Sequence, residues 1–416
     1  MRLAALKHQR SGPLARCHAP HRVVSSESSR KPRRMSLTGP VFLGLVALVT
    51  VVAFVVLVLL WPSLAGRRPG KIAIRAGMLL TVNALVLLTA VTQLNAQFLF
   101  FADWTDLRGA LSNVTTVTAL SRGTTASHAT STTVRGTAAT AGGVLPPLPA
   151  GRVSSSGVIS YTVKGPLSRI VGTVVVQLPP GYTEAANASV LYPVIEAFQG
   201  YPGSAESWIS VMNLGGVAAE EAAAKRLSPV LVVSPQVEFP SGVDTECVNG
   251  STGKPPVETW LAQDVPNWVA HTFRVQTDRS SWAAIGLSAG GWCAAMVAML
   301  HPAQYAAAIV MSGYFHPEFG PFYEPYPPRS SLTARYDLVA LTRRNPPPVA
   351  VWLLTSHVDA VSYRSSAALI KAARPPLAVD AIVLQNAGHR VSLWQGVLPN
   401  SLTWLGANVS GFKATP

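Results

Sequence analysis

The sequence predicts an α/β fold, in which a mostly parallel β-sheet carries helices on both faces, preceded by two membrane-spanning helices and a linker. Two observations predict this arrangement. From about residue 158 onward, short apolar runs alternate with stretches of helical character. Before that point come two long uncharged segments, and then a region with too few large apolar residues to form a core.

The two N-terminal apolar segments are each long enough to cross a bilayer. Residues 41–61 carry no charge and many Val and Leu residues. Residues 77–101 are also uncharged and include Asn83, Asn95 and several Thr residues. We therefore predict two transmembrane helices within residues 35–104, and expect the cytoplasmic membrane as a partner of the chain.

The positive charge of the chain is concentrated around these segments. The net charge is +14, of which residues 1–151 contribute 16 Lys and Arg against 3 Asp and Glu, while residues 152–416 contribute 17 against 16. Because the basic residues accompany the apolar segments and not the remainder of the chain, the composition favours a membrane over nucleic acid as the partner.

The orientation depends on where translation begins. Residues 1–34 form a basic extension that we expect to be disordered, and Met35 offers an alternative start. With a start at Met35, the basic loop 62–75 is cytoplasmic by the positive-inside rule, and everything after residue 101 is outside. A genuine basic tail would instead be cytoplasmic and would place the C-terminal region inside. We predict a protein of the cell membrane whose C-terminal domain is extracytoplasmic.

The remainder of the chain divides into a linker and a domain. Residues 105–157 are rich in Ala, Thr, Ser and Gly and predict a flexible linker. Residues 158–416 carry the strand-like runs ISYTV, GTVVVQL, YPVIEAF, PVLVVSP, WAAIG, YAAAIVMSG, VAVWLLT and DAIVLQ. The first two adjoin and predict a hairpin, whereas helices between most of the later runs predict the parallel sheet.

A nucleophile motif lies within AIGLSAGGWCAAMVAMLHP, which begins at Ala284. Gly286, Ser288 and Gly290 fit the pattern G-x-S-x-G, in which a Ser occupies a sharp turn between a strand and a helix and its neighbours must be small. A strand-like run precedes the motif, and an Ala-rich helical stretch follows it. That context favours a nucleophile elbow over a glycine-rich turn with an incidental Ser.

The elbow predicts a base later in the chain, since an α/β-hydrolase sheet orders its triad as Ser, acid, His. Four His residues follow Ser288. We favour His389, which comes after the last predicted strand. The remaining candidates are less well placed. His301 lies at the end of the elbow helix, His316 in an aromatic loop, and His357 in the loop that also carries the predicted acid.

The predicted acid is Asp359, which follows the strand VAVWLLT. A carboxylate at that place would hold the tautomer of the imidazole. Asp337 lies in a helical stretch and Asp380 begins a strand, so both are less well placed.

The predicted oxyanion hole joins two backbone N–H groups, one directly after the nucleophile and one from the loop after an early strand. The first is that of Ala289. The second is that of Tyr201 in FQGYPG, where Gly200 permits a tight turn and Gln199 and Gly200 are expected to contact substrate.

Three Cys residues are present, at positions 17, 247 and 293. None belongs to a C-x-x-C or Cys/His cluster, so we expect neither a metal nor a cofactor. In an exported domain, Cys247 and Cys293 are either a disulfide or two separate buried thiols. We predict the disulfide, because the helix after the Cys247 loop should pack beside the elbow helix that carries Cys293.

These residues resemble a known family. Residues 160–410 are similar to the esterase-D-like α/β hydrolases, and among them to the mycobacterial mycolyltransferases. The similarity lies in AFQGYPGSAESW, the Cys-containing loop before VETWLAQDVPNWV, GLSAGGWCAAMVAMLHPAQYAAAIVMSGYF and GHRVSLWQGVLPNSL. It implies Ser288 and His389 as catalytic residues, Tyr201 as the second oxyanion donor, and ester hydrolysis or acyl transfer outside the cytoplasmic membrane.

The chain departs from the mycolyltransferases in three ways. Their acid is Glu, where this chain offers Asp359. Their sugar-contacting Asp is replaced here by Gln199, so we expect hydrolysis to dominate when trehalose is the only acceptor. They also lack a two-span anchor of this kind.

The predicted function is therefore a membrane-anchored serine esterase or acyltransferase that acts on acyl esters, thioesters or glycolipids of the cell envelope. The first alternative is a non-catalytic envelope-binding protein on the same fold. The presence of all three triad candidates favours the enzyme. A membrane sensor is a further alternative, but no signalling motif supports it.

The predicted orientation can be tested with reporter fusions. Alkaline phosphatase fused after residue 150 should be active, because it folds outside the cytoplasm, whereas a fusion within residues 62–75 should be inactive. The reverse pattern would show that residues 1–34 set the topology and that the domain lies inside.

Overall fold

The computed structural model describes residues 36–111, 120–123, 148, 150–153, 158–320 and 323–414. The predicted basic extension, residues 1–34, lies outside these ranges. Most of the predicted linker does so as well.

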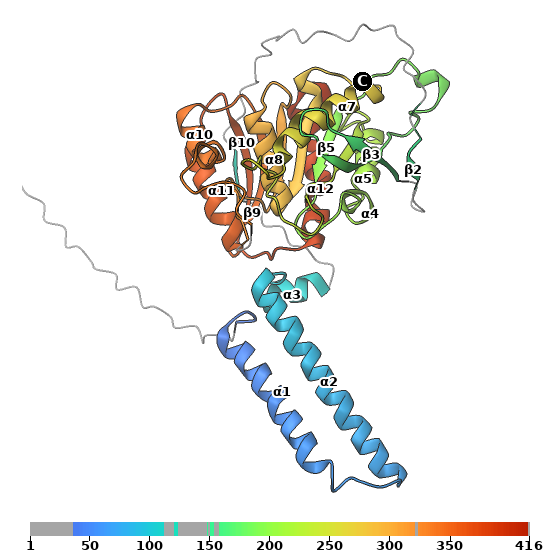
Figure 1. The fold of residues 1–416 in the computed structure, drawn as a ribbon, viewed down its shortest axis with the longest axis vertical. Helices are drawn as coiled ribbons and strands as arrows, with labels where there is room; N and C mark the ends of the chain where they lie inside the picture. The colour runs from blue at the N-terminus through green and yellow to red at the C-terminus, as the bar shows by residue number, and fades with distance from the viewer. Residues whose placement is uncertain are drawn as a thin grey trace, which may run out of the picture. The chain divides into compact units, whose positions relative to one another are not determined.

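A single ten-stranded sheet organises the C-terminal part of the chain (Figure 1). Its strands are β1 (Leu120–Gly123), β2 (Arg152–Val153), β3 (Ile159–Lys164), β4 (Val171–Gln177), β5 (Val194–Phe198), β6 (Leu231–Pro235), β7 (Trp282–Leu287), β8 (Ala307–Met311), β9 (Ala350–Ser356) and β10 (Ala378–Leu384). Their order is β1-β10-β9-β8-β7-β5-β6-β4-β3-β2. The six strands from β10 to β6 in this order are parallel, and β1, β4, β3 and β2 are antiparallel to their neighbours. The predicted parallel sheet and the predicted β3–β4 hairpin are thus confirmed.

Helices connect the strands and precede them. They are α1 (Pro40–Leu60), α2 (Pro69–Phe98), α3 (Trp104–Leu111), α4 (Ser207–Ser210), α5 (Leu214–Ala223), α6 (Val257–Thr259), α7 (Val265–Thr272), α8 (Ala289–Leu300), α9 (Ser331–Arg335), α10 (Leu338–Arg344), α11 (Ala360–Ala372) and α12 (Val391–Asn408). Short 3₁₀ turns occur at Ala185–Asn187, Arg279–Ser281 and Ser410–Phe412, and a π-helical turn at Trp260–Asp264 joins α6 to α7.

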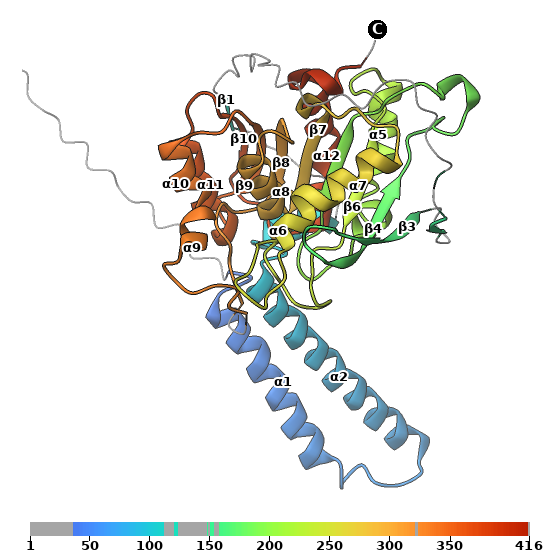
Figure 2. The same ribbon diagram turned by 45° about the horizontal axis from the view of Figure 1, so that its top comes forward.

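The sheet buries both of its faces, which explains why its strands are continuous apolar runs and not alternating ones. Along β5, Val194 and Phe198 face one core, and Ile195 and Ala197 face the other. Helices α6, α7, α8, α10 and α11 contribute to the first core, and α4, α5 and α12 to the second. Figure 2 shows α7 and α8 in front of the sheet. Helix α8 is apolar along nearly its whole length because it is almost entirely buried.

Helices α1 and α2 are both long and apolar enough to cross a membrane. They lie against each other, and the hydroxyls of Thr50 and Thr89 are 2.8 Å apart between them. Most of their Val and Leu side chains are exposed. Helix α2 begins at Pro69, eight residues before the predicted span, because Pro at the first helical position is compatible with a helix start.

Three short elements fall inside the predicted linker, so that prediction was incomplete. Helix α3 follows α2 directly, β1 pairs with β10 at one edge of the sheet, and β2 pairs with β3 at the other. Edge pairing uses backbone hydrogen bonds and does not require large apolar side chains, so a composition argument did not detect it.

The structure joins Cys247 and Cys293 by a disulfide with a Cα–Cα distance of 5.6 Å. Both residues are buried, Cys293 in α8 and Cys247 in the loop between β6 and α6. The indole N–H of Trp292 also donates to the carbonyl O of Glu246, at 2.7 Å. The two contacts fix the 246–247 segment against the helix that follows Ser288.

Loss of this disulfide should destabilise the fold. The bridge closes a loop of 46 residues, for which the chain-entropy argument gives a stabilisation of about 2–4 kcal/mol. The double variant Cys247→Ser/Cys293→Ser should therefore melt at a lower temperature than the parent protein. Alkylation of both thiols in the unreduced native protein, detected by mass spectrometry, would contradict the bridge.

Candidate active site

The candidate nucleophile occupies a sharp turn between β7 and α8. Strand β7 ends at Leu287 and α8 begins at Ala289, so the whole change of direction falls on Ser288. Its backbone has φ 55° and ψ −128°, a conformation that costs a non-glycine residue free energy. The N–H of Ser288 donates to the carbonyl O of Met311 on the neighbouring strand β8, at 2.9 Å, and so holds the turn.

Two glycines around Ser288 are required by close backbone contacts. A Cβ on Gly286 would lie 1.8 Å from the carbonyl O of Gly290, across the turn. A Cβ on Gly290 would lie 2.0 Å from the carbonyl O of Phe198, at the end of β5. Neither atom belongs to a flexible side chain, so any larger residue would have to displace the backbone. The glycine pattern in the sequence therefore has a steric cause.

Three side chains meet at the carboxyl edge of the parallel strands. Ser288 follows β7, Asp359 follows β9 and His389 follows β10. The Nε2 atom of His389 lies 2.8 Å from Oγ of Ser288, and its Nδ1 atom lies 2.8 Å from Oδ2 of Asp359. The structure thus brings the three sequence-predicted triad residues into one hydrogen-bonded chain.

The carboxylate of this chain is buried and held from two sides. Asp359 is 4% exposed and accepts from His389 at Oδ2 and from the N–H of Ser362 at Oδ1. Burial alone would raise the pKa of Asp359, but the hydrogen bond and charge interaction with His389 and the bonds from Ser362 outweigh it and lower the pKa. Asp359 is therefore ionised at neutral pH, as an acceptor for the Nδ1–H group must be.

The competing histidines have other partners. His301 lies 2.7 Å from buried Glu258, and His316 pairs with Glu318 at 3.5 Å. The ring of His357 lies 4.3 Å from that of Tyr363. None of the three contacts Ser288.

The competing acids also have structural partners. Asp337 caps the N-terminus of α10 by accepting from the N–H of Ala340, at 2.8 Å. Asp380 accepts from the indole N–H of Trp404, at 2.7 Å. Both contacts satisfy the carboxylates away from His389.

The end of β5 approaches Ser288 closely. A Cβ on Gly200 would lie 3.1 Å from Cβ of Ser288, so the backbone of the 199–201 segment runs beside the nucleophile. Tyr201 follows directly and is 44% exposed, and its hydroxyl donates to the carbonyl O of Gly242 at 3.0 Å. Ala289 lies on the other side of Ser288, where its N–H belongs to the first turn of α8. The positive end of the helix dipole therefore lies at the nucleophile.

Glu238 supports the Tyr201 loop and was not predicted from the sequence. This carboxylate is 6% exposed and accepts from the N–H groups of Gly203, at 3.2 Å, and Gly242, at 2.8 Å. It thereby ties the Tyr201 loop to the loop after β6. No spacing in the sequence marked Glu238, because its partners are backbone groups.

Gln199 lies inside the protein at the end of β5. It is only 3% exposed, and its Oε1 atom has no hydrogen-bond partner among the described residues. A buried amide oxygen without a partner costs free energy unless a further donor reaches it.

Trp394 is a second residue that the sequence did not reveal. Its ring stands edge-on to that of His389, with centroids 4.9 Å apart, and its indole N–H donates to Oγ of Ser312 at 3.0 Å. The contact limits rotation of the imidazole. Trp394 lies in α12, five residues after His389. Its contact with the imidazole depends on the turn between His389 and α12, which the sequence pattern does not specify.

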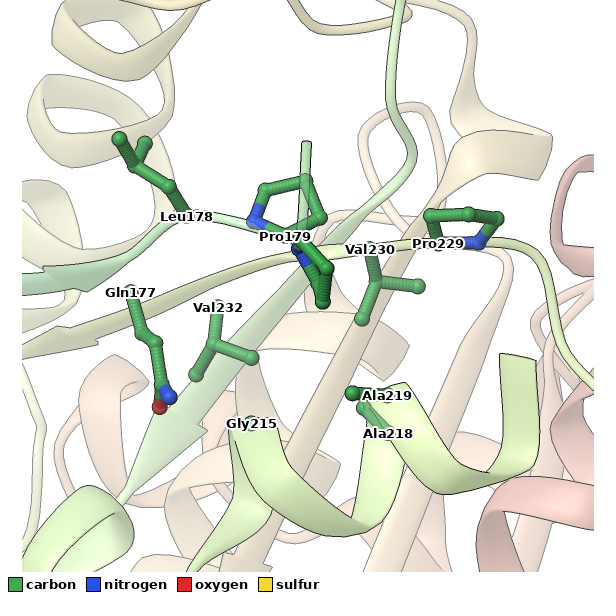
Figure 3. Close-up of a pocket in the computed structure, with 10 residues that line it drawn as sticks. Gln177, Leu178, Pro179, Gly215, Ala218, Ala219, Pro229, Val230 and Val232 are labelled. Carbon is green, nitrogen blue, oxygen red and sulfur yellow. The ribbon is translucent and has the colours of Figure 1, made fainter. Parts of the chain in front are cut away.

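A small hollow lies between β4, α5 and the start of β6 (Figure 3). Gln177, Pro179, Gly215, Ala219 and Val230 are among its lining residues. The register of β4 and β5 with β6 places it at the amino ends of the parallel strands. It contains no residue that could serve as nucleophile or base, so it offers no second centre for ester chemistry.

Known proteins resemble this chain in sequence and in fold. A curated uncharacterized protein of Corynebacterium glutamicum is 32% identical over 144 residues, which cover 34% of this chain and 33% of that protein. The alignment thus spans about a third of the length of this relative.

Solved structures share the fold of the domain. A ferulic acid esterase superposes with a TM-score of 0.51 at 17% identity, covering 61% of this chain and 98% of that one. An S-formylglutathione hydrolase from Agrobacterium tumefaciens gives a TM-score of 0.52 at 12% identity, covering 63% and 99%.

A match to a family model identifies the family of this chain. The Esterase family model matches residues 171–403, more than half of the chain, from β4 to within α12. This span includes Ser288, Asp359 and His389. The chain belongs to the Esterase family of α/β hydrolases.

Proposed function

We propose that this protein is a membrane-anchored serine esterase that forms an acyl-enzyme on Ser288. His389 is the base, and the carboxylate of Asp359 is the acidic member of the triad that orients it. The observation that carries the proposal is the unbroken hydrogen-bonded chain from Oγ of Ser288 through both ring nitrogens of His389 to the buried carboxylate of Asp359. A nucleophile, a base in contact with it and a group that orients the base are the parts that acyl transfer requires.

Acylation begins when Nε2 of His389 takes the proton of Ser288. The Oγ atom attacks the carbonyl carbon of an ester or thioester, and the carbonyl oxygen becomes an oxyanion. The N–H groups of Ala289 and Tyr201 donate to this oxyanion. When the tetrahedral intermediate collapses, the leaving alcohol or thiol takes the proton from His389 and departs, leaving the acyl group on Ser288.

Deacylation repeats these steps with water. His389 removes a proton from the water molecule, the resulting hydroxide attacks the acyl carbon, and Ser288 leaves with the proton. Throughout, ionised Asp359 accepts from Nδ1–H, which keeps Nε2 free to accept a proton and stabilises the imidazolium that forms.

Several features support attachment to the cell membrane and an envelope substrate. Helices α1 and α2 have exposed apolar surfaces and lengths of 21 and 30 residues, which suit a bilayer. Arg67 and Arg68 precede α2, and Lys71 and Arg75 lie in its first two turns, which favours a cytoplasmic position for this end. The esterase domain then lies on the outer side, where the Cys247–Cys293 disulfide is chemically stable.

Gln199 favours hydrolysis over transfer to a sugar. Transfer requires the site to bind an acceptor alcohol better than water. A charged Asp accepts two strong hydrogen bonds from sugar hydroxyls, whereas the amide of Gln199 has one acceptor oxygen. We therefore propose water as the principal acceptor.

The variant Ser288→Ala tests the proposal directly. It should lower the turnover of p-nitrophenyl esters by about a millionfold, because the nucleophile is lost. It should also abolish covalent labelling by a fluorophosphonate. Ser401→Ala is the matched control, since Ser401 is also buried and bonds to the carbonyl O of Leu398 within α12. Retained turnover in Ser288→Ala would overturn the proposal.

Asp359→Asn tests the role of the acid. It should lower kcat by about 10⁴-fold, because an amide can hold the wrong tautomer of His389. The control is Asp337→Asn, because Asp337 caps α10 as Asp359 caps α11, by accepting from an N–H three residues on. Equal activities of the two variants would show that Asp359 is only a helix cap.

The lowered pKa of Asp359 also gives this variant a signature in the pH dependence of stability. The native carboxylate stabilises the fold above the unfolded pKa near 4, and this stabilisation is lost as the pH falls through the lower native pKa. Below about pH 4, the melting temperature of Asp359→Asn should therefore fall less steeply with decreasing pH than that of the parent protein.

A further inference from the structure

The segment that follows α2 makes direct contact with the loop that carries His389. We call residues 99–106 the post-helix segment and residues 386–390 the histidine loop. Leu99 ends α2 with a φ of 54°, and its carbonyl O accepts from the N–H of His389 at 2.8 Å. One hydrogen bond thus links the end of an apolar helix to the backbone of the proposed base.

Asp106 makes three more contacts in the same place. Its side chain accepts from the N–H of Ala102, at 3.0 Å within its own segment, and from the N–H of Gly388, at 3.0 Å across the interface. The guanidinium of Arg390 completes its surroundings, at 2.7 Å. The side chains of Asp106 and Arg390 are only 4% and 12% exposed, so solvent screens this ion pair little.

The backbones of the two segments are also in close contact. A Cβ on Gly388 would lie 2.2 Å from the carbonyl O of Phe100, so only glycine fits there without displacing one of the segments. At the far end of the loop, Asn386 donates to Asp103. Within the post-helix segment, the amide of Asn95 both accepts from the N–H of Phe101 and donates to its carbonyl O. The segment is therefore fixed to α2 on one side and to the histidine loop on the other.

We propose that Asp106 is a positioning residue for His389 and that the post-helix segment is part of the active site. The N–H groups of Gly388 and His389 both donate hydrogen bonds to this segment. The two ring nitrogens of His389 lie 2.8 Å from Ser288 and from Asp359. A shift of the loop must therefore lengthen at least one of the ring contacts. A displacement of about 1 Å in catalytic geometry can cost about 100-fold in rate.

The proposal rests on the proposed esterase function, and full-length protein in detergent micelles can test it. Asp106→Ala should lower kcat for p-nitrophenyl esters by about 100-fold, with KM changed by less than about threefold, because Asp106 does not touch substrate. The second-order rate of fluorophosphonate labelling should fall by a similar factor, since it reports the reactivity of Ser288 alone. Asp106→Asn, which keeps one acceptor oxygen, should lose less.

Asp264→Ala is the matched control. Asp264 is 1% exposed and likewise accepts from two backbone N–H groups of a remote segment, those of Leu167 at 3.0 Å and Ser168 at 2.8 Å. It has no contact with the triad. Its substitution should lower the melting temperature but leave kcat per folded molecule unchanged. If Asp106→Ala behaves in the same way, its role is structural and the proposal is wrong.

A double-mutant cycle supplies an independent test. Gly388→Ala should separate the same two segments by a steric clash. The double variant Asp106→Ala/Gly388→Ala should therefore lose little more kcat than Gly388→Ala alone. Multiplicative losses would contradict a shared mechanism. Failure of this proposal is distinguishable from failure of the proposed function, because Ser288→Ala would still be inactive when Asp106→Ala retains full kcat.

Discussion

The candidate site depends on the backbone of Ser288. This residue has a positive φ, and the surrounding structure must compensate for that conformation. Part of the compensation is the hydrogen bond from its N–H to Met311, and part is the close contact of Gly290 with the end of β5. The backbone of Gly200 also lies beside Ser288, since a Cβ added to Gly200 would be 3.1 Å from Cβ of Ser288. One strained residue thus lies where the N-terminus of α8, the backbone around Gly200 and the serine hydroxyl come together.

Much of this arrangement could be predicted from the sequence because it has local causes. The glycines around Ser288 reflect contacts within a few residues of the turn, and the parallel sheet reflects apolar runs of strand length. Asp359 and His389 were found because each follows a strand, and the carboxyl ends of parallel strands share one edge of a sheet. Order along the chain was therefore enough to propose three residues that are distant in sequence.

What could not be predicted depends on partners that no spacing reveals. Glu238 and Asp106 bind backbone N–H groups of other segments, and backbone groups leave no mark in a sequence. Buried carboxylates pose the same difficulty. Burial raises the pKa of Glu196 to about 8 despite a hydrogen bond from Tyr305. Burial would also raise the pKa of Glu258, but bonds from His301, Arg335 and Tyr336 outweigh it and lower this pKa to about 2. The pKa values of two buried Glu residues thus shift in opposite directions, because the fold gives them different neighbours.

The contact between Asp106 and Gly388 joins residues 282 positions apart. The two partners therefore leave the ribosome at very different times, and Asp106 has no counterpart until residue 388 has been made. Contacts between distant parts of a chain form only after the intervening residues have been ordered, since loop closure costs entropy. His389 follows Ser288 by 101 residues. A growing chain in which Ser288 has already been translated therefore still lacks His389, its proposed base.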